Sequence, residues 1–262
     1  MNRLIKLFRK LKTGITKKYS ESNLFRISNR YLLFQKNAII TDLTKVKPNL
    51  LILGSQKCGT TSLHNYLNKH PDIFMSSPMK EPGYFIYDEW MREHWSSQNL
   101  KISNKQELLL SFMLKTYKGE KYFGESSTYY TIGERDKLLG IPELIKNQTS
   151  TDVRFLYIIR NPFARIVSLY YHLKKYENYT GTLNELLSRS DSALNTSLYF
   201  TRINNYLHTF KKESFHIVQF EDLIEQPQQV VSLIYSFLNL TNYEQNEFNK
   251  TKPKQRQLEA KK

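Results

Sequence analysis

The feature that most constrains this chain is a short apolar strand that runs directly into a glycine-bounded loop. Residues 49–53 read Asn-Leu-Leu-Ile-Leu, which is apolar throughout after its first residue. Such a run is typical of a strand buried on both faces, as in a parallel sheet covered by helices. The loop Gly54-Ser55-Gln56-Lys57-Cys58-Gly59-Thr60-Thr61 follows, and residues 60–69 predict a helix that stops near Pro71. A strand, a turn and a helix in this order begin an α/β fold.

Strand and helix patterns then alternate along the chain. Further strands are predicted over residues 121–124, 153–159 and 214–219. Helices are predicted over residues 105–117, 136–147, 162–175, 195–211 and 227–238. This alternation predicts a P-loop-like, three-layer α/β/α fold around a central parallel sheet. The length of 262 residues, of which 40% are hydrophobic, suits one such domain better than two.

The loop after the first strand is suited to binding a phosphate. Backbone N–H groups at the start of a helix have no partner within the helix, and the helix dipole favours an anion there. Lys57 adds a positive charge, and Thr60 and Thr61 add hydroxyl donors. In the ATP-binding pattern the lysine follows the second glycine, whereas Lys57 precedes Gly59. A P-loop nucleotide kinase is therefore a weakened alternative, all the more because no acidic residue ends the strand at 153–159.

A second candidate phosphate site follows the strand at 153–159. The segment reads Arg160-Asn161-Pro162-Phe163-Ala164-Arg165-Ile166-Val167-Ser168. Arg160 stands at the carboxyl edge of the sheet, where open α/β sheets bind their ligands. Its planar guanidinium suits a phosphate, and Ser168 lies about two turns into the helix that Pro162 begins. Taken alone, this motif leaves open that Arg160 only forms a surface salt bridge.

Together the two motifs resemble those of the sulfotransferases that use 3′-phosphoadenosine 5′-phosphosulfate (PAPS). Gly-x-x-Lys-x-Gly-Thr-Thr is similar to the 5′-phosphosulfate loop of that family, and Arg-Asn-Pro-x-x-Arg-x-x-Ser is similar to its 3′-phosphate segment. The resemblance covers about residues 48–240 and implies sulfuryl transfer from PAPS, with Lys57 as a catalytic residue at the leaving phosphate oxygen. It implies that the donor is bound by Ser55, Gln56, Lys57, Cys58, Gly59, Thr60, Thr61, Ser62, Arg160, Ser168 and Tyr199.

The segment between the two motifs resembles the carbohydrate branch of that family, which includes the heparan sulfate sulfotransferases. Residues 80–85 match its Lys-Glu-Pro-x-x-Phe pattern, which implies that Glu81 is the general base. Residues 124–130 resemble a second segment of the branch, although Ser126 stands where lysine is common. Glu125 and Ser126 are therefore acceptor-side candidates, and Glu125 is the rival base. The branch implies a carbohydrate or glycolipid acceptor, sulfated on oxygen or on nitrogen.

Cysteine and histidine usage argues against two common kinds of site. Cys58 is the only cysteine, so no disulfide forms within the chain, and a cytoplasmic location is expected. The six histidines show no metal-ligand spacing, so no bound metal is expected. Basic residues interrupt the apolar N-terminal segment, which therefore resembles neither a signal peptide nor a membrane-spanning helix.

Basic charge is concentrated at the two ends of the chain. The formal charge is +15, yet residues 49–249 hold 21 basic and 21 acidic residues. We therefore divide the chain into a basic amphipathic extension (1–47), a sulfotransferase domain (48–249) and a basic tail (250–262). The neutral body argues against a nucleic-acid partner. The extension predicts peripheral membrane contact, with packing against the body as one alternative and a non-catalytic polyanion-binding module as another.

Overall fold

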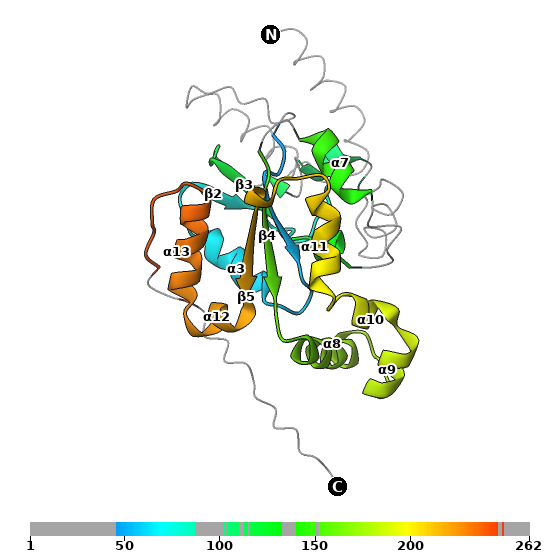
Figure 1. Ribbon diagram of the computed structural model, residues 1–262. Coiled ribbons are helices and arrows are strands. Elements are labelled where there is room, and N and C mark those ends of the chain that lie inside the picture. Colours follow the sequence, from blue (N-terminus) through cyan, green and yellow to red (C-terminus); the bar gives the residue numbers. More distant parts are fainter. Residues whose placement is uncertain are drawn as a thin grey trace, which may run out of the picture. The chain divides into compact units, whose positions relative to one another are not determined.

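A five-stranded sheet organises the part of the chain that the computed structural model describes, which comprises residues 46–86, 102, 104–109, 113–114, 116–132, 140–149, 152–245 and 248. The order of the strands is β2-β3-β1-β4-β5 (Figure 1). All four pairings are parallel. The strands are β1 (Leu50–Gly54), β2 (Ile73–Met75), β3 (Tyr122–Glu125), β4 (Arg154–Ile159) and β5 (Phe215–Gln219). The predicted fold class is thereby confirmed.

The central strand β1 is held at its start and irregular at its end. Asn49 donates its backbone N–H to Phe123 O at 2.9 Å and accepts the Phe123 N–H at its side-chain Oδ1 at 2.8 Å, which ties β1 to β3. All five residues of β1 are buried, as its apolar run predicts. On the other side, Ile52 pairs with Leu156 and Gly54 with Tyr157, so the register shifts just before the loop. The shift ends regular pairing where the phosphate loop begins.

Helices cover both faces of the sheet, which gives the three layers seen in Figure 1. On one face, Leu50, Ile52 and Leu156 belong to a buried core with residues of α3 and α13. On the other face, Phe155 packs against Tyr206 of α11, with ring centroids 5.8 Å apart. The helices are α3 (Thr60–Leu67), α5 (Lys105–Leu108), α7 (Ile141–Gln148), α8 (Pro162–Tyr176), α9 (Leu183–Arg189), α10 (Asp191–Asn195), α11 (Tyr199–Leu207), α12 (Phe220–Glu225) and α13 (Pro227–Phe237).

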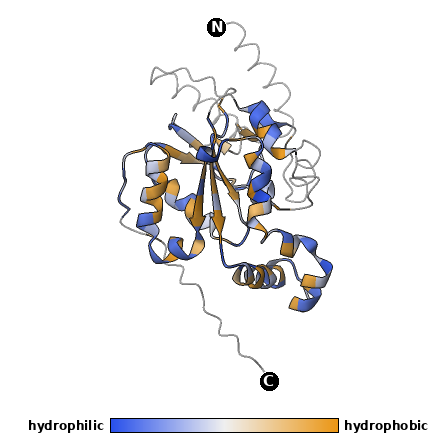
Figure 2. Ribbon diagram, in the orientation of Figure 1, coloured by the Kyte–Doolittle hydropathy of each residue, from blue (hydrophilic) through white to orange (hydrophobic). Residues whose placement is uncertain are grey.

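Hydropathy follows this layering. The strands are predominantly hydrophobic, whereas the helices carry hydrophilic residues on their outer faces (Figure 2). Four of the six residues of β4 are buried, and only its two ends are partly exposed. These short apolar runs form strands because the helices on both faces of the sheet remove them from water.

Some predicted helices differ from the observed ones. The helix predicted over residues 195–211 is interrupted, because α10 ends at Asn195 and α11 begins at Tyr199. In the turn between them, the Thr196 carbonyl accepts a hydrogen bond from the buried Ser55 hydroxyl at 3.3 Å. The Ser197 hydroxyl accepts one from Arg165 Nε at 2.6 Å. These tertiary bonds favour a turn over continuous helix.

The helix predicted over residues 105–117 is described only in part, because residues 110–112 and 115 lie outside the described residues. α5 spans Lys105–Leu108, Leu114 donates its N–H to Leu109 O at 2.9 Å, and Leu114 also forms an isolated parallel bridge with Ser77. The predicted helix at 136–147 corresponds to α7, whose first residue is Ile141. Strand β2 and helices α9, α10 and α12 were not predicted, apart from the last residue of α10. The predicted extension up to residue 45 and the tail from residue 250 lie outside the described residues.

Candidate active site

The loop after β1 is fixed at its base by the neighbouring strand. Ser55, which is fully buried, donates its backbone N–H to Ile158 O of β4 at 2.8 Å. Cys58 then donates its N–H back to Ser55 O at 3.2 Å, which closes a tight turn around Gln56 and Lys57. The loop is therefore a preformed turn at the carboxyl edge of the sheet, where ligands of α/β folds bind.

Two left-handed residues direct the loop into helix α3. Lys57 has φ of 68° and Gly59 has φ of 88°, a region that glycine occupies without steric cost. Gly59 is also the N-cap of α3, and Leu63 N–H bonds its carbonyl at 3.1 Å. The N–H groups of Thr60, Thr61 and Ser62 belong to the first turn of α3 and have no carbonyl partner within the helix. The predicted loop-to-helix junction is thus present, and its role as an anion site stays a prediction.

The side chains of the loop differ in their ability to ionise. Lys57 is partly buried, and burial lowers the pKa of its ammonium, with Arg160 adding to the effect and Tyr176 and Glu81 opposing it. Burial raises the pKa of the Cys58 thiol to about 11. Cys58 is therefore a protonated, buried thiol near neutral pH and not a nucleophile. Within the described part of the loop, Lys57 carries the positive charge.

Arg160 connects the second motif directly to the first. Its Nη1 donates to Lys57 O at 3.0 Å, and its guanidinium lies 4.3 Å from the centre of the Phe220 ring. Its Nε is buried and has no hydrogen-bond partner among the described residues. Tyr199, the first residue of α11, donates its hydroxyl to Arg160 O at 2.8 Å. Arg160 is thus held at Nη1 and against the Phe220 ring, and its planar guanidinium, with five N–H donors, suits an anionic ligand.

The other polar residues of this motif lie further along α8. Ser168 is partly buried about two turns into the helix, and the structure shows no hydrogen bond between it and the described loop residues. Arg165 is fully buried and donates to the Ala193 carbonyl and the Ser197 hydroxyl. The structure therefore brings Arg160 and Tyr199 to the loop, whereas Arg165 ties α8 to the turn before α11.

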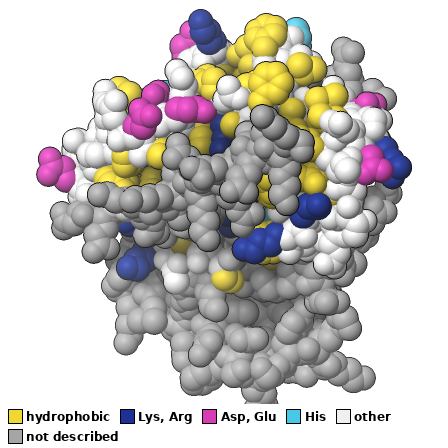
Figure 3. All heavy atoms as spheres, turned by 90° about the horizontal axis from the view of Figure 1, so that it is seen from below, with side chains coloured by type: hydrophobic (Ala, Val, Ile, Leu, Met, Phe, Trp, Pro, Cys, Tyr) yellow, Lys and Arg dark blue, Asp and Glu magenta, His cyan; other side chains and the backbone are white. Residues whose placement is uncertain are grey.

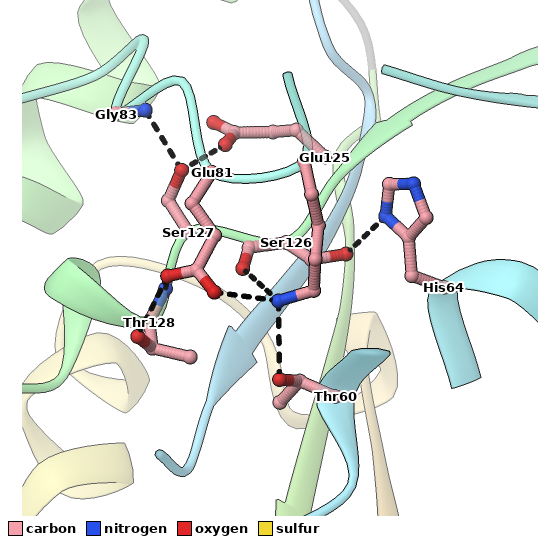
Figure 4. A network of polar contacts seen from close by, with 9 residues as sticks. Thr60, His64, Glu81, Gly83, Glu125, Ser126, Ser127 and Thr128 are labelled. Carbon is pink, nitrogen blue, oxygen red and sulfur yellow. Dashed lines mark hydrogen bonds and ion pairs between the residues drawn. The ribbon is translucent and has the colours of Figure 1, made fainter. Parts of the chain in front are cut away.

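Lys80 is the residue that links the loop to the acceptor-side segment. Its ammonium lies 2.6 Å from Glu81 Oε1, 3.3 Å from Thr60 Oγ1 and 3.4 Å from Ser126 O. Glu81 accepts two further bonds at Oε2, from the hydroxyl (2.9 Å) and the N–H (3.4 Å) of Thr128. Figure 4 shows Thr60, Glu81 and Thr128 gathered around this network. Glu81 keeps 33% of its side chain exposed, so its carboxylate is accessible from solvent.

Glu125 and Ser126 are fully buried. Glu125 accepts hydrogen bonds from the hydroxyls of Ser127 and Tyr130, and burial raises its pKa to about 7, which the two hydroxyls partly oppose. The Ser126 hydroxyl lies 2.7 Å from Nδ1 of His64 in α3 (Figure 4). Burial, together with the charge of Lys80, lowers the pKa of His64 to about 3. Neither predicted acceptor-side candidate is exposed to an acceptor in this conformation.

Three residues of the site were not among the predicted functional residues. Lys80 entered the prediction only as the first residue of the Lys-Glu-Pro-x-x-Phe pattern, and neither Thr128 nor Phe220 was predicted to belong to the site. Each acts through a contact with a residue far away in the sequence: Thr60, Glu81 and Arg160, respectively. One feature of the sequence pointed to Lys80. Ser126 stands where the branch commonly has lysine, and the ammonium of Lys80 contacts the carbonyl oxygen of Ser126.

Neither a metal-binding cluster nor a membrane-spanning helix is found among the described residues. Among them, no group of three or more His, Cys, Asp or Glu side chains is placed to hold a metal ion. None of the described helices combines the length and the hydrophobicity that crossing a membrane requires.

The family follows from comparison with known proteins. The family model described as the sulfotransferase domain matches residues 47–261, so the chain belongs to the sulfotransferase family. A sulfotransferase from Alicyclobacillus acidocaldarius has a similar structure, with a TM-score of 0.64 and 26% sequence identity. The match covers 78% of this chain and 85% of that one. The predicted family is thereby confirmed.

Several relatives are named as heparan sulfate enzymes. Heparan sulfate glucosamine 3-O-sulfotransferase 5 of Mus musculus is 29% identical over 213 residues, which cover 76% of this chain and 55% of that protein. Bifunctional heparan sulfate N-deacetylase/N-sulfotransferase 1 of Homo sapiens is 23% identical over 211 residues, which cover 74% and 22%. The chain thus spans about half, or less, of the length of these relatives.

These findings do not favour the two alternative functions. A kinase would need an acidic residue after β4, where the structure places Arg160 against the loop. The polyanion-binding alternative depends on the two basic ends of the chain, most of which lies outside the described residues. On the face seen in Figure 3, basic and acidic side chains of the described residues are interspersed.

Proposed function

We propose that the chain transfers a sulfuryl group from PAPS to a hydroxyl or amine of a carbohydrate or glycolipid acceptor. The observation that carries the proposal is the position of Lys80. Its ammonium contacts both Thr60, in the donor-side loop, and Glu81, the candidate base. A donor at the loop and an acceptor proton at Glu81 would therefore be only a few ångströms apart, as direct group transfer requires.

The described residues fit the two phosphate groups of the donor. The first-turn N–H groups of α3 and the ammonium of Lys57 suit the 5′-phosphosulfate. Arg160, whose Nε has no partner among the described residues, suits the 3′-phosphate, with Ser168 and Tyr199 as further candidates. The Nη1 bond from Arg160 to Lys57 O supports a single donor that spans both places.

The proposed reaction is an in-line transfer assisted by a base. The acceptor oxygen or nitrogen attacks the sulfur, Glu81 takes its proton, and the bond between sulfur and the 5′-phosphate oxygen breaks. Adenosine 3′,5′-bisphosphate leaves with the negative charge on that oxygen, which Lys57 and the loop N–H groups stabilise. The burial that lowers the pKa of Lys57 also makes its proton easier to share with the leaving oxygen.

The donor assignment is tested by calorimetric binding of adenosine 3′,5′-bisphosphate and of ATP with Mg²⁺. The wild type is expected to prefer the bisphosphate. Arg160→Ala is expected to weaken bisphosphate binding by about 10- to 150-fold, the loss of one charged hydrogen bond. Arg189→Ala is the matched control, because Arg189 Nη2 is 3.7 Å from Glu185 Oε1 on α9 and its side chain is 76% exposed. Preference for ATP, or equal losses in both variants, would contradict the assignment.

The acceptor class is tested by transfer of ³⁵S from labelled PAPS to a panel of acceptors. The panel contains desulfated heparan sulfate, its N-deacetylated form, neutral glycolipids and a phenol. Incorporation into a saccharide, lost in Glu81→Gln and in Lys57→Ala, supports the proposal. The position of the label separates oxygen from nitrogen sulfation. Incorporation into the phenol alone would refute a carbohydrate acceptor.

We also propose that residues 48–249 form the catalytic unit and that the basic extension of residues 1–47 holds it at the cytoplasmic face of a membrane. The extension carries 12 basic and two acidic residues, a balance that anionic lipid attracts. Cosedimentation of the full chain with phosphatidylserine vesicles is the test, with phosphatidylcholine vesicles as control. Binding that persists when Arg3, Lys6, Arg9 and Lys10 are all changed to glutamine would contradict the role of the extension.

A further inference from the structure

Glu125 is a buried carboxylate whose two partners are both hydroxyl groups. It is the last residue of β3 and is fully buried. The hydroxyls of Ser127 and Tyr130 donate to its two oxygens, one to each. Glu125 is therefore held by neutral donors from the turn that follows it. Burying a carboxylate with neutral partners alone is costly, so this arrangement calls for an explanation.

The same two hydroxyls reach the segment that carries Glu81. Gly83 donates its backbone N–H to Ser127 Oγ at 2.8 Å, and Phe85 donates its own to the Tyr130 hydroxyl at 3.1 Å. A hydroxyl has one hydrogen to donate and two lone pairs to accept with. Because each hydrogen is directed at Glu125, the lone pairs are left to face the two backbone amides. Figure 4 shows this line of contacts from Glu125 through Ser127 to Gly83.

We propose that Glu125 is a positioning residue that orients the Ser127 and Tyr130 hydroxyls and thereby holds residues 81–85, and with them the Glu81 carboxylate, at the reaction centre. Full burial separates Glu125 from any acceptor, whereas Glu81 is 33% exposed and bonded to Thr128 of the same turn. The two carboxylates thus have different roles. This proposal rests on the proposed function for its kinetic consequences, but its structural content can be measured independently.

Other contacts of the network do not involve the Glu125 carboxylate. Ser126 N–H bonds Lys80 O at 3.1 Å, and β3 pairs with β1 and β2 through its backbone. The phosphate loop is tied to β4 through Ser55 and Ile158 and does not depend on Glu125. Loss of the carboxylate is therefore expected to loosen the segment around Glu81 while the donor site is preserved.

Glu125→Gln is the first test, with the exposed Glu213→Gln as the matched control. The amide of glutamine must donate to one hydroxyl, whose own hydrogen then lacks its acceptor. We expect kcat to fall by about 10- to 100-fold, the effect of a slightly misplaced catalytic group. The affinity for adenosine 3′,5′-bisphosphate is expected to stay within about twofold, since neither phosphate site uses Glu125. Glu81→Gln is expected to lose more, about 100- to 10,000-fold, as the removal of a general base does.

Hydrogen exchange of single backbone amides gives a readout that does not need activity. In Glu125→Gln the amides of Gly83 and Phe85 are expected to exchange about 2- to 10-fold faster, as weakened hydrogen bonds allow. The Ser55 amide, bonded to β4, is the internal control and is expected to be unchanged. Ser127→Ala and Tyr130→Phe are expected to affect Gly83 and Phe85 separately.

Each outcome decides between specific roles. A kcat loss in Glu125→Gln as large as that in Glu81→Gln, with unchanged exchange, would make Glu125 the base and refute positioning. Wild-type kcat and wild-type exchange in Glu125→Gln would refute it as well. If Glu125→Gln does not fold, Ser127→Ala and Tyr130→Phe carry the same exchange and kcat tests. Failure of the wild type to bind the bisphosphate would refute the proposed function alone, because the exchange experiment would still decide whether Glu125 holds the segment.

Discussion

Replacing Gly59 with alanine is expected to destabilise the protein by about 2–5 kcal/mol, the sum of two separate costs. Gly59 has φ of 88°, and the left-handed conformation costs other residues about 1–2 kcal/mol. A Cβ at this position would lie 2.8 Å from Cδ2 and 2.9 Å from Cε2 of Phe220. Overpacking of this kind costs about 1–3 kcal/mol. Because single domains are stable by about 5–15 kcal/mol, the variant is expected to fold with a lowered unfolding midpoint.

The chain offers a matched control that separates the two costs. Gly119 has φ of 95°, and a Cβ there would meet nothing within 4 Å. Gly119→Ala is therefore expected to show only the conformational cost, about 1–2 kcal/mol. In a Phe220→Ala background, Gly59→Ala is expected to approach the same value, since the ring that it meets is gone.

Urea unfolding followed by far-ultraviolet circular dichroism measures these free energies. Four proteins complete the cycle: the wild type, Gly59→Ala, Phe220→Ala and the double variant. A coupling free energy of about 1–3 kcal/mol between the two positions is expected from the overpacking alone. Equal penalties with and without the Phe220 ring would refute the close approach of α12 to the phosphate loop. A penalty near zero in both backgrounds would refute the left-handed conformation of Gly59.

Three further predictions concern charge and capping. The lowered pKa of His64, about 3, means that the unfolded chain takes up its proton first as pH falls below 6.5, so this residue costs stability on acidification. As pH falls from 6.5 to 5, the free energy of unfolding of His64→Asn is therefore expected to rise by about 2 kcal/mol relative to that of the wild type, measured by urea unfolding. The raised pKa of Glu125, about 7, has the opposite sign, because the folded chain keeps a proton that the unfolded one loses above pH 4.5. As pH rises from 4.5 to 8, the free energy of unfolding of Glu125→Gln is expected to rise on the order of 3 kcal/mol relative to that of the wild type. A difference that does not change with pH would contradict the burial of an ionising carboxylate. Thr182 and Glu185 form a capping box at the start of α9, so Thr182→Ala is expected to cost about 1 kcal/mol in the same assay, and Thr182→Ser close to none.

The core of the fold could be predicted because its signals are local. The apolar runs at β1 and β4, and the glycines and Pro162 beside them, define strand ends and helix starts within a few residues. The two phosphate motifs lie at those junctions, so their meeting at one edge follows from parallel topology alone. The bond from Arg160 to Lys57 O, which joins residues 103 positions apart, agrees with that expectation.

The remaining features depend on contacts that no local pattern contains. β2 has only three residues and follows a turn, so it is too short for a periodic signal. Lys80 follows this edge strand, so its position beside Thr60 could not be deduced without predicting the strand. The burial of Glu125 was likewise invisible, because a glutamate in a polar segment is usually exposed. The difference between Glu81 and Glu125 is one of burial, and burial is a property of the folded chain.

The order of the strands divides the site between two sides of β1. The segments with Glu81 and Glu125 follow β2 and β3, whereas Arg160 follows β4 on the opposite side. Only the loop after β1 borders both. Under the proposed function, acceptor choice and recognition of the 3′-phosphate therefore lie on different sides of β1, so the acceptor side can diversify in evolution while Arg160 stays constant.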